Sequence, residues 1–340
     1  MRLATIPAWL LGLASSLNAV YAQTPSGAPP APATTGPRID SDAALPDQFR
    51  DSSTYRLWAG RAPGAKSDSP EETPTLTWFP PPMGRVNGTA VIVGPGGGYL
   101  GLAGALEGTE PASWLTARGV TAFVLQYRVG AAARLPIPLF DGARAVRFVR
   151  AHAADFHVDP TRIGMMGFSA GGHLAAMTAV ESSPGNVDSA DPIERVSSRP
   201  DFVILGYPWL EATQLMADGH SQYCDFATWL THVPCQPQDY ARFTPRLYVT
   251  SKEPPTFIYH TSDDEVVPSE GTLRFYEALR KQNVPVEMHL FEHGLHGTGL
   301  GGSDVSLSLW PQLLQEWMRR RGLLPEIPQV SVLQQTPHGK

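Results

Sequence analysis

The residue best able to do chemistry is a serine between two glycines, Ser169 in the segment GFSAG. The apolar run RIGMM before it predicts a strand, and the run AGGHLAAMTAV after it predicts a helix. Small neighbours let the backbone turn sharply between such a strand and helix, so that the serine hydroxyl projects from the turn. The N-terminus of the helix would also stabilise negative charge on a reacting oxygen. This pattern predicts Ser169 as a nucleophile.

A serine hydroxyl reacts only weakly without a base, so the ten histidines of the chain are candidates. His173 lies one helical turn beyond Ser169 and points away from the hydroxyl, which predicts a packed structural residue. The loop EHGLHG follows the last expected strand and contains two better candidates. We expect His296 to be the base because the glycine after it gives the backbone more freedom, and His293 is the alternative.

A catalytic imidazole also needs an acidic partner that fixes its orientation and stabilises its protonated form. The segment HTSDDEVVP begins at the end of the strand expected at residues 256–260, between the serine and the histidine in chain order. Asp264 is the expected partner, and Asp263 is the alternative. The carboxylate that does not reach the imidazole would cap the turn or face solvent.

A glycine-rich loop, GPGGGY, follows the strand expected at residues 89–93. Adjacent glycines allow backbone N–H groups to approach a substrate oxygen closely. We expect the N–H groups of Gly97, Gly98 and Ala170 to form an oxyanion hole beside the nucleophile.

The same loop permits a second interpretation, because GGGYLG also has the G-x-G-x-x-G pattern of dinucleotide-binding proteins. Such a site requires an acidic residue where the next strand ends, but that strand ends in QYR. Arg128 would fit only a phosphorylated cofactor, and a nucleotide site would leave the serine, aspartate and histidine loops without a purpose. We therefore expect no cofactor. The chain also has no C-x-x-C or H-E-x-x-H motif, so we expect no metal site.

Short apolar strands alternate with helices from residue 89 onward. Strands are expected at residues 89–93, 120–127, 162–166, 202–205, 256–260 and 286–291, and helices at residues 111–119, 138–156, 269–282 and 305–321 as well as after Ser169. This alternation predicts an α/β fold with a mostly parallel central sheet and helices on both faces. In such sheets the functional residues gather where strands end. The spacing of Arg144, Arg147 and Arg150 predicts a solvated helix face.

The ends of the chain differ in composition from its centre. Residues 1–22 have a cationic start, an apolar run and small residues, which predict a signal peptide, with a retained membrane anchor as the alternative. Residues 23–50 are rich in Pro and Ala and predict a disordered tether, while residues 326–340 form a C-terminal tail. Residues 51–325 fit a single domain, in which residues 209–252 form a lid-like insertion. We therefore expect a secreted or periplasmic protein.

Charge and cysteine content narrow the possible partners. The net charge of −6, with no basic run longer than RRR, argues against nucleic acid. After the N-terminal segment, no apolar run is long enough to span a membrane. Cys224 and Cys235 are the only cysteines, and in an exported protein such a close pair predicts a disulfide, with two free thiols as the alternative.

Taken in order, the segments GPGGGY, QYRV, DGARAVRFVRAHA, RIGMMGFSAGGHLA, PPTFIYHTSDDEVVP and FEHGLHG resemble the secreted α/β-hydrolase esterases grouped with acetylxylan and feruloyl esterase-like enzymes. The resemblance covers about residues 58–317 and implies an α/β-hydrolase fold with Ser169, Asp264 and His296 as the catalytic triad. It also implies a serine esterase that removes acetyl or other short acyl groups from plant polysaccharide such as xylan, or from its fragments, through an acyl-enzyme intermediate. The segment at residues 209–252 departs from the family.

The aromatic residues near that segment permit more than one interpretation of the substrate. Trp209, Tyr223 and Trp229 would stack on sugar rings, or they would form a small core beneath the loop. Tyr207, Pro208 and Trp209 follow a strand end and would close an acyl pocket near the nucleophile, which predicts a preference for short acyl groups. The alternative functions are a serine peptidase of the same fold, a general short-chain carboxylesterase or lipase, and a non-catalytic binding protein.

Overall fold

The computed structural model of the protein describes residues 53–82, 84–130, 134–211, 241–302 and 304–325. The expected signal peptide, tether and C-terminal tail lie outside these residues, as do Cys224, Cys235 and most of the lid-like insertion. Within the described ranges, no helix is long and apolar enough to cross a membrane, and no cluster of His, Cys, Asp or Glu side chains could hold a metal ion.

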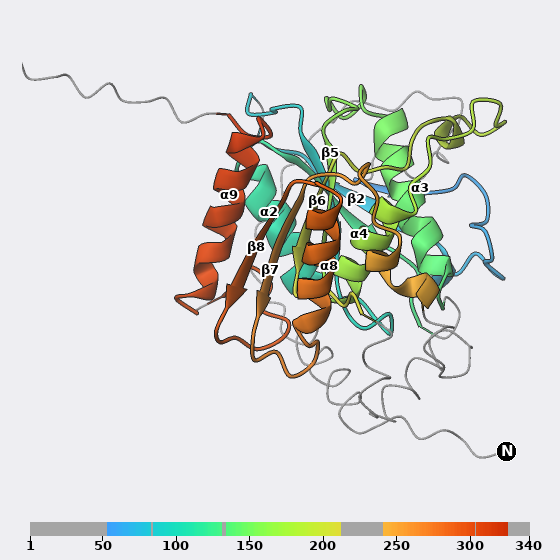
Figure 1. The fold of residues 1–340 in the computed structure, drawn as a ribbon. Coiled ribbons are helices and arrows are strands. Elements are labelled where there is room, and N and C mark those ends of the chain that lie inside the picture. The colour runs from blue at the N-terminus through green and yellow to red at the C-terminus, as the bar shows by residue number, and fades with distance from the viewer. Residues whose placement is uncertain (1–52, 83, 131–133, 212–240, 303, 326–340) are drawn as a thin grey trace, which may run out of the picture.

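The part of the chain that the structure describes forms one sheet of eight strands, in the order β1-β2-β4-β3-β5-β6-β7-β8 (Figure 1). The strands are β1 (Thr54–Arg56), β2 (Thr75–Phe79), β3 (Ala90–Gly94), β4 (Thr121–Gln126), β5 (Ile163–Phe168), β6 (Phe202–Gly206), β7 (Thr256–Thr261) and β8 (Val286–Phe291). Strands β3 to β8 run parallel, whereas β2 pairs with β1 and with β4 in antiparallel fashion. The carboxyl ends of the parallel strands therefore meet along one edge of the sheet.

Helices cover both faces of this sheet (Figure 1). The described α-helices are α2 (Glu110–Thr116), α3 (Ile137–Ala151), α4 (Ala170–Val180), α8 (Glu270–Lys281) and α9 (Trp310–Arg320). Helices α2 and α9 pack on one face, and α3, α4 and α8 pack on the other. Short 3-10 or π turns lie at Pro70–Glu72, Ala105–Thr109, Pro192–Arg195, Ala241–Phe243, Pro245–Leu247 and Leu307–Leu309. The predicted α/β fold with a mostly parallel sheet is confirmed.

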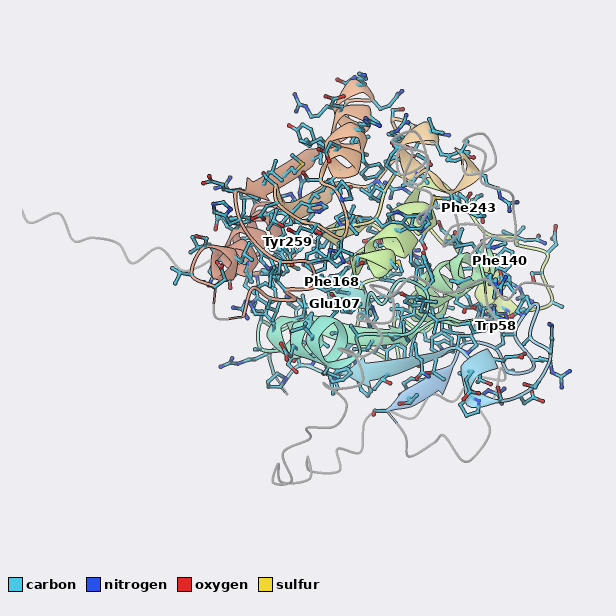
Figure 2. All side chains as sticks on the ribbon, turned by 90° about the horizontal axis from the view of Figure 1, so that it is seen from below. Trp58, Glu107, Phe140, Phe168, Phe243 and Tyr259 are labelled. Atoms are coloured by element: carbon cyan, nitrogen blue, oxygen red, sulfur yellow. The ribbon has the colours of Figure 1, made fainter. Side chains whose placement is uncertain are left out.

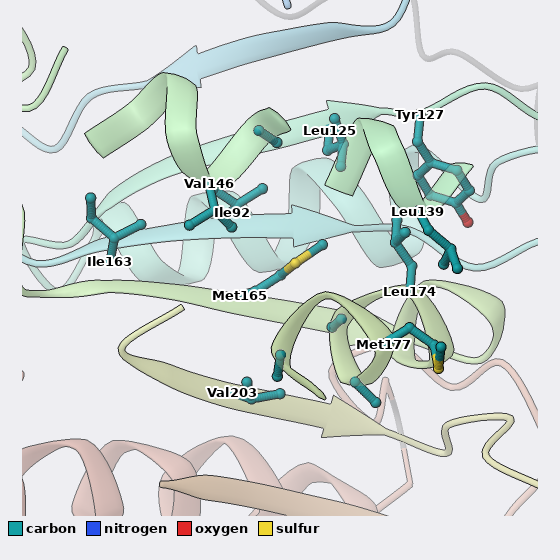
Figure 3. Packing of buried hydrophobic residues seen from close by; sticks show 14 of the residues in the cluster. Ile92, Leu125, Tyr127, Leu139, Val146, Ile163, Met165, Leu174, Met177 and Val203 are labelled. Atoms are coloured by element: carbon teal, nitrogen blue, oxygen red, sulfur yellow. The ribbon is translucent and has the colours of Figure 1, made fainter. Parts of the chain in front are cut away.

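The alternation of side chains along the strands explains the two layers. In β3, Ile92 belongs to the core beneath α3 and α4, whereas Val91 and Val93 belong to the core beneath α2 and α9. Figure 3 shows the first of these cores, in which Ile92 and Met165 share a cluster with Leu174 of α4. Because both faces are covered, the central strands are apolar at nearly every position.

Strands β1 and β2 have no counterpart among the expected elements. They are the short segments TYR and TLTWF, which lie before the glycine-rich loop. Their pairing depends on a distant partner, since Leu76 of β2 lies opposite Leu125 of β4. Local sequence patterns do not reveal such a partner, because strand stability depends on neighbours across the sheet.

The expectation that Arg144, Arg147 and Arg150 form a solvated face is wrong. Arg144 is only 2% exposed, and it binds Asp191 and Glu194, with N–O distances of 2.7 Å in both ion pairs. The other two arginines bind the same connection between α4 and β6. The three arginines therefore link the segment between α4 and β6 to α3.

Arg128, which the dinucleotide interpretation requires for a phosphate, is instead part of the core. Its buried guanidinium donates to both carboxylate oxygens of Asp141, at 2.6 to 3.1 Å, and to the carbonyl oxygen of Pro63 at 2.8 Å. Burial raises the pKa of Asp141, and the hydrogen bonds and charge of Arg128 oppose this effect. The guanidinium of Arg128 thus forms a buried ion pair with Asp141 and does not face a phosphate site.

Candidate active site

Ser169 lies at the sharp turn between β5 and α4, as the sequence predicts. Its backbone angles, φ 51° and ψ −119°, are unusual for a residue with a side chain and indicate strain. Neighbouring segments hold the turn: the Ser169 N–H donates to the Gly206 carbonyl at 3.0 Å, and its own carbonyl accepts from the Trp209 N–H at 3.1 Å. Glycine is required at Gly171, because a Cβ there would lie 2.0 Å from the carbonyl oxygen of Gly94.

Three residues from three loops form one chain of hydrogen bonds. The Ser169 hydroxyl donates to Nε2 of His296 across 2.8 Å, and Nδ1–H of His296 donates to Oδ2 of Asp264 across 2.7 Å. Because an ionised carboxylate can only accept, the imidazole carries its proton on Nδ1 and presents a lone pair to the serine. In this arrangement the imidazole can remove the hydroxyl proton while the carboxylate stabilises the resulting positive charge.

Asp264 is held by more than the imidazole of His296. Its Oδ1 accepts the N–H groups of Val266 and Val267 at 2.9 and 2.8 Å, and its Oδ2 also accepts from Nε2–H of His260 at 3.2 Å. Burial alone would raise the pKa of Asp264, but the hydrogen bonds from His260, His296 and Val267 together hold it well below the usual range. Asp264 therefore stays ionised beside the base.

His260 was not expected at the site. It is buried near the end of β7, where its Nδ1 accepts the Thr272 hydroxyl at 2.8 Å and its Nε2–H is shared between Asp264 and the Val267 carbonyl. The one signal in the sequence is a histidine that directly follows the apolar run FIY, four positions before Asp264. His260 thus helps to hold the same carboxylate oxygen that accepts the proton of His296.

The alternative base and acid, His293 and Asp263, bind each other. Nδ1 of His293 lies 2.9 Å from Oδ2 of Asp263, and the histidine side chain is 76% exposed. Oδ1 of Asp263 accepts the Gly294 N–H at 2.8 Å. The hydrogen bond with Asp263 raises the pKa of His293. This pair lies at the surface, apart from the hydrogen-bonded chain that ends at Ser169.

The glycine-rich loop lies directly against the nucleophile. A Cβ on Gly96 would lie only 2.9 Å from Cβ of Ser169. The next two residues, Gly97 and Gly98, have positive φ angles of 132° and 62°, and no described residue accepts a hydrogen bond from either N–H. Ala170 is the first residue of α4, where an N–H group has no partner within the helix. The N–H groups of Gly97 and Gly98 are thus not used by the described part of the chain, and the role of these two residues and Ala170 as oxyanion donors stays a prediction.

His173 supports this loop, which confirms the prediction of a packed residue. Its Nε2–H donates to the Phe243 carbonyl at 2.8 Å, so its Nδ1 accepts the Tyr99 hydroxyl at 2.7 Å. Tyr99 directly follows the glycines and has a positive φ of 58°. Burial lowers the pKa of His173 to about 4, so the ring remains neutral and keeps both hydrogen bonds at neutral pH.

The aromatic residues after β6 differ from the expected pocket wall. Tyr207 is only 2% exposed, and its ring centre lies 4.9 Å from that of His296. Trp209 is partly buried against the core, and its ring centre lies 4.9 Å from that of His173 in α4. Tyr223 and Trp229 lie outside the described residues. The buried ring of Tyr207 thus packs against the imidazole of His296. A role for Trp209 in sugar stacking stays a prediction.

Fold and site together define an α/β-hydrolase. A mostly parallel sheet carries the serine after β5, the aspartate after β7 and the histidine after β8. Residues 79–279 match the family model named BD-FAE, and the chain belongs to the BD-FAE family. The resemblance to acetylxylan and feruloyl esterase-like hydrolases is thereby confirmed at the level of the family.

Solved structures share this architecture. An acetyl ester-xyloside bifunctional hydrolase from Caldicellulosiruptor lactoaceticus is 36% identical with a TM-score of 0.73, over 81% of this chain and 98% of that one. The carboxylesterase Cest-2923 from Lactobacillus plantarum WCFS1 is 25% identical with a TM-score of 0.62, over 75% of this chain and 94% of that one. The predicted α/β-hydrolase fold is confirmed by these similarities.

Curated relatives are considerably longer than the matched region. Endo-1,4-beta-xylanase B of Butyrivibrio fibrisolvens is 34% identical over 226 residues, which cover 65% of this chain and 34% of the relative. An acetylxylan esterase of Xylanibacter ruminicola is 29% identical over 246 residues, which cover 68% of this chain and 46% of the relative. This chain therefore spans between a third and a half of these two proteins.

Proposed function

We propose that this protein is a serine carboxylic-ester hydrolase whose catalytic residues are Ser169, His296 and Asp264. The observation that carries the proposal is the chain of hydrogen bonds from the serine hydroxyl through both imidazole nitrogens to the carboxylate, at 2.8 and 2.7 Å. These residue types, in contact in this order, are what activation of a serine for acyl transfer requires. Membership of the BD-FAE family and similarity to esterases support the same reaction.

The first half-reaction forms an acyl-enzyme. Oγ of Ser169 attacks the ester carbonyl carbon while Nε2 of His296 takes the hydroxyl proton, and Asp264 stabilises the imidazolium. The carbonyl oxygen becomes an oxyanion that accepts hydrogen bonds from the N–H groups of Gly97, Gly98 and Ala170. When the intermediate collapses, the bond to the alcohol oxygen breaks and the imidazolium gives that oxygen its proton. The acyl group remains on the serine.

The second half-reaction releases the acid. A water molecule attacks the acyl carbon while the neutral imidazole of His296 takes one of its protons. The same N–H groups stabilise the second oxyanion. Collapse of this intermediate breaks the bond to Oγ, which regains a proton from His296, and the carboxylic acid leaves.

For the substrate, we propose acetyl or other short acyl esters of xylan or its fragments. The support comes from two similar proteins, one named an acetylxylan esterase and one titled an acetyl ester-xyloside bifunctional hydrolase. A serine peptidase would use the same three residues, but none of the similar proteins described above is a peptidase. Esters are also the easier acyl donors for this chemistry, because an alcohol leaves more readily than an amine.

The preference for short acyl groups is testable with p-nitrophenyl acetate, butyrate and octanoate. The preference is proposed from the similarity to two proteins whose names refer to acetyl esters rather than from a pocket wall, because the rings of Tyr207 and Trp209 pack against His296 and His173. We expect kcat/KM for acetate to exceed that for octanoate by roughly 10- to 200-fold. Acetate release from acetylated xylan should occur in parallel, and a peptide substrate should remain intact. An optimum at octanoate would contradict the short-acyl proposal.

We also propose that the chain is exported, to the periplasm or the medium, and that Cys224 and Cys235 form a disulfide. The composition of residues 1–22 and the close spacing of the cysteines support this. Mass spectrometry of a non-reduced digest should find the two cysteine peptides joined, and intact-mass analysis should find residues 1–22 removed. Two cysteines that alkylate freely without reductant would contradict the disulfide.

A further inference from the structure

A buried carboxyl group lies beside the nucleophile and takes no part in the proton transfers described above. Glu107 belongs to the π turn Ala105–Thr109 and is 3% exposed. Figure 2 shows it in the interior of the molecule close to Phe168, the residue before Ser169. A Cβ added to Gly96 would lie 2.6 Å from Oε2 of Glu107 and 2.9 Å from Cβ of Ser169, so both side chains adjoin the same point of the glycine-rich loop.

Each carboxyl oxygen of Glu107 binds a different part of the site. Oε2 accepts the N–H of Gly96 across 2.7 Å, and Gly96 directly precedes the proposed oxyanion donors Gly97 and Gly98. Oε1 accepts the hydroxyl of Tyr207 across 2.7 Å. One buried carboxyl group thus joins the glycine-rich loop to the segment that follows β6.

Tyr207 extends this connection to the loop that carries the base. Its hydroxyl oxygen accepts the N–H of Gly299, three residues after His296, across 2.8 Å. Its ring packs edge-on against the imidazole of His296, with an interplanar angle of 64°. The positive φ of 34° at Tyr207 is a strained conformation that the surrounding contacts must maintain. The phenol therefore meets the base loop through both its hydroxyl and its ring.

We propose that Glu107 and Tyr207 are joint positioning residues for ester hydrolysis, and that their carboxyl–phenol bridge fixes the distance between the oxyanion loop and the base loop across Ser169. The inference rests on the proposed function, because the bridge has this role only in that reaction. Oxyanion binding and proton transfer occur in the same transition state, so both loops must be placed to within a fraction of an ångström.

The cost of burying Glu107 argues for a purpose beyond packing. Burial raises the pKa of Glu107, whereas the hydrogen bonds from Tyr207 and Gly96 and the attraction of His296 oppose this effect. An apolar side chain would fill the same space without a desolvation cost. A glutamate suits the position because each of its two oxygens can accept a hydrogen bond from a different loop.

Tyr207→Phe is the cleanest test, because it keeps the ring against His296 and removes only the hydroxyl that binds Glu107 and Gly299. We expect kcat for p-nitrophenyl acetate to fall roughly 10- to 100-fold, the size of effect that small misplacement of reacting groups produces. KM should change much less than kcat, since the lost contacts act on the transition state rather than on substrate binding. Glu107→Gln should cause a similar loss, because its amide NH₂ cannot accept a hydrogen bond.

A double variant distinguishes one bridge from two independent supports. If Glu107 and Tyr207 act as a unit, the double variant should have the same kcat as the less active of the two single variants, because the second substitution removes no further contact. Losses that multiply would overturn the bridge. Circular dichroism and thermal unfolding identify a misfolded variant, and Tyr207→Phe alone carries the test if Glu107→Gln does not fold.

Tyr127→Phe is a matched control for loss of a buried phenol hydrogen bond. The Tyr127 hydroxyl donates to the Pro95 carbonyl at 2.6 Å, so it supports the glycine-rich loop without reaching the base loop. We expect its kcat to stay well above that of Tyr207→Phe, and an equal loss would overturn the bridge. Wild-type protein and Ser169→Ala belong in the same assay. An inactive wild type would contradict the proposed function, whereas an active wild type with full kcat in Tyr207→Phe would overturn the positioning role alone.

Discussion

Replacement of Ser169 by alanine should reduce kcat for ester hydrolysis by roughly a millionfold, as loss of an activated serine does in other hydrolases. The hydroxyl supplies the oxygen that forms the acyl-enzyme, and alanine has no proton to give to His296. The remaining rate would come from substrate held beside the oxyanion donors and attacked by water. Steady-state kinetics with p-nitrophenyl acetate measures the loss.

A second serine provides the control for this experiment. Ser113→Ala changes an exposed serine of α2, whose hydroxyl donates to the carbonyl of Thr109, the residue directly before this helix. It should retain wild-type kinetics. Thermal unfolding should show that Ser169→Ala is folded with stability near that of the wild type, because alanine keeps the Cβ at this turn and removes only one hydroxyl. Near-wild-type turnover in folded Ser169→Ala would refute a serine mechanism.

His296→Ala should be nearly as damaging as loss of the nucleophile, with kcat again reduced by roughly a millionfold. Serine and base act as one unit, so either deletion abolishes the same proton transfer. His293→Ala is the matched control, because this exposed histidine lies in the same loop and binds Asp263. It should keep kcat and KM close to those of the wild type, as measured with the same ester.

The comparison of the two histidines also tests the neighbouring acids. If His293→Ala were inactive and His296→Ala active, base and acid would have to be His293 and Asp263, and the 2.8 Å contact of His296 with Ser169 would have no catalytic meaning. Equal, modest losses in both variants would indicate that neither imidazole accepts the serine proton.

The residues proposed for catalysis could be identified from sequence because each one lies just after a strand in a parallel sheet. Ser169 follows an apolar strand and opens a helix, and Asp264 and His296 follow the last two strands. The carboxyl ends of parallel strands lie next to one another, so residues just after them come together regardless of loop conformation. The alternatives Asp263 and His293 could not be separated from them in this way, because Asp263 is adjacent to Asp264 in the sequence and His293 lies in the same loop as His296.

Residues that act through distant contacts could not be found in this way. Glu107 lies in a π turn with no repeating pattern, and its partners Gly96 and Tyr207 are 11 and 100 positions away. Arg144 has the helical spacing of a solvated residue, but it is buried by the connection between α4 and β6, which has little regular structure of its own. In the sequence, His260 looks like an ordinary strand residue, because its contact with the Asp264 carboxylate is visible only in the fold. In each case, the partner that gives the residue its role is set by the tertiary fold.

Covalent labelling of the nucleophile tests the central claim most directly. Diethyl p-nitrophenyl phosphate reacts with a serine only when a base activates it and oxyanion donors bind the phosphoryl oxygen. Peptide mapping of the inhibited protein should find one diethylphosphoryl group, on Ser169, with loss of activity in proportion to labelling. Labelling should disappear in Ser169→Ala and slow strongly in His296→Ala but not in His293→Ala. Inactivation with the phosphoryl group on another residue, or an active protein that is never labelled at Ser169, would contradict the account.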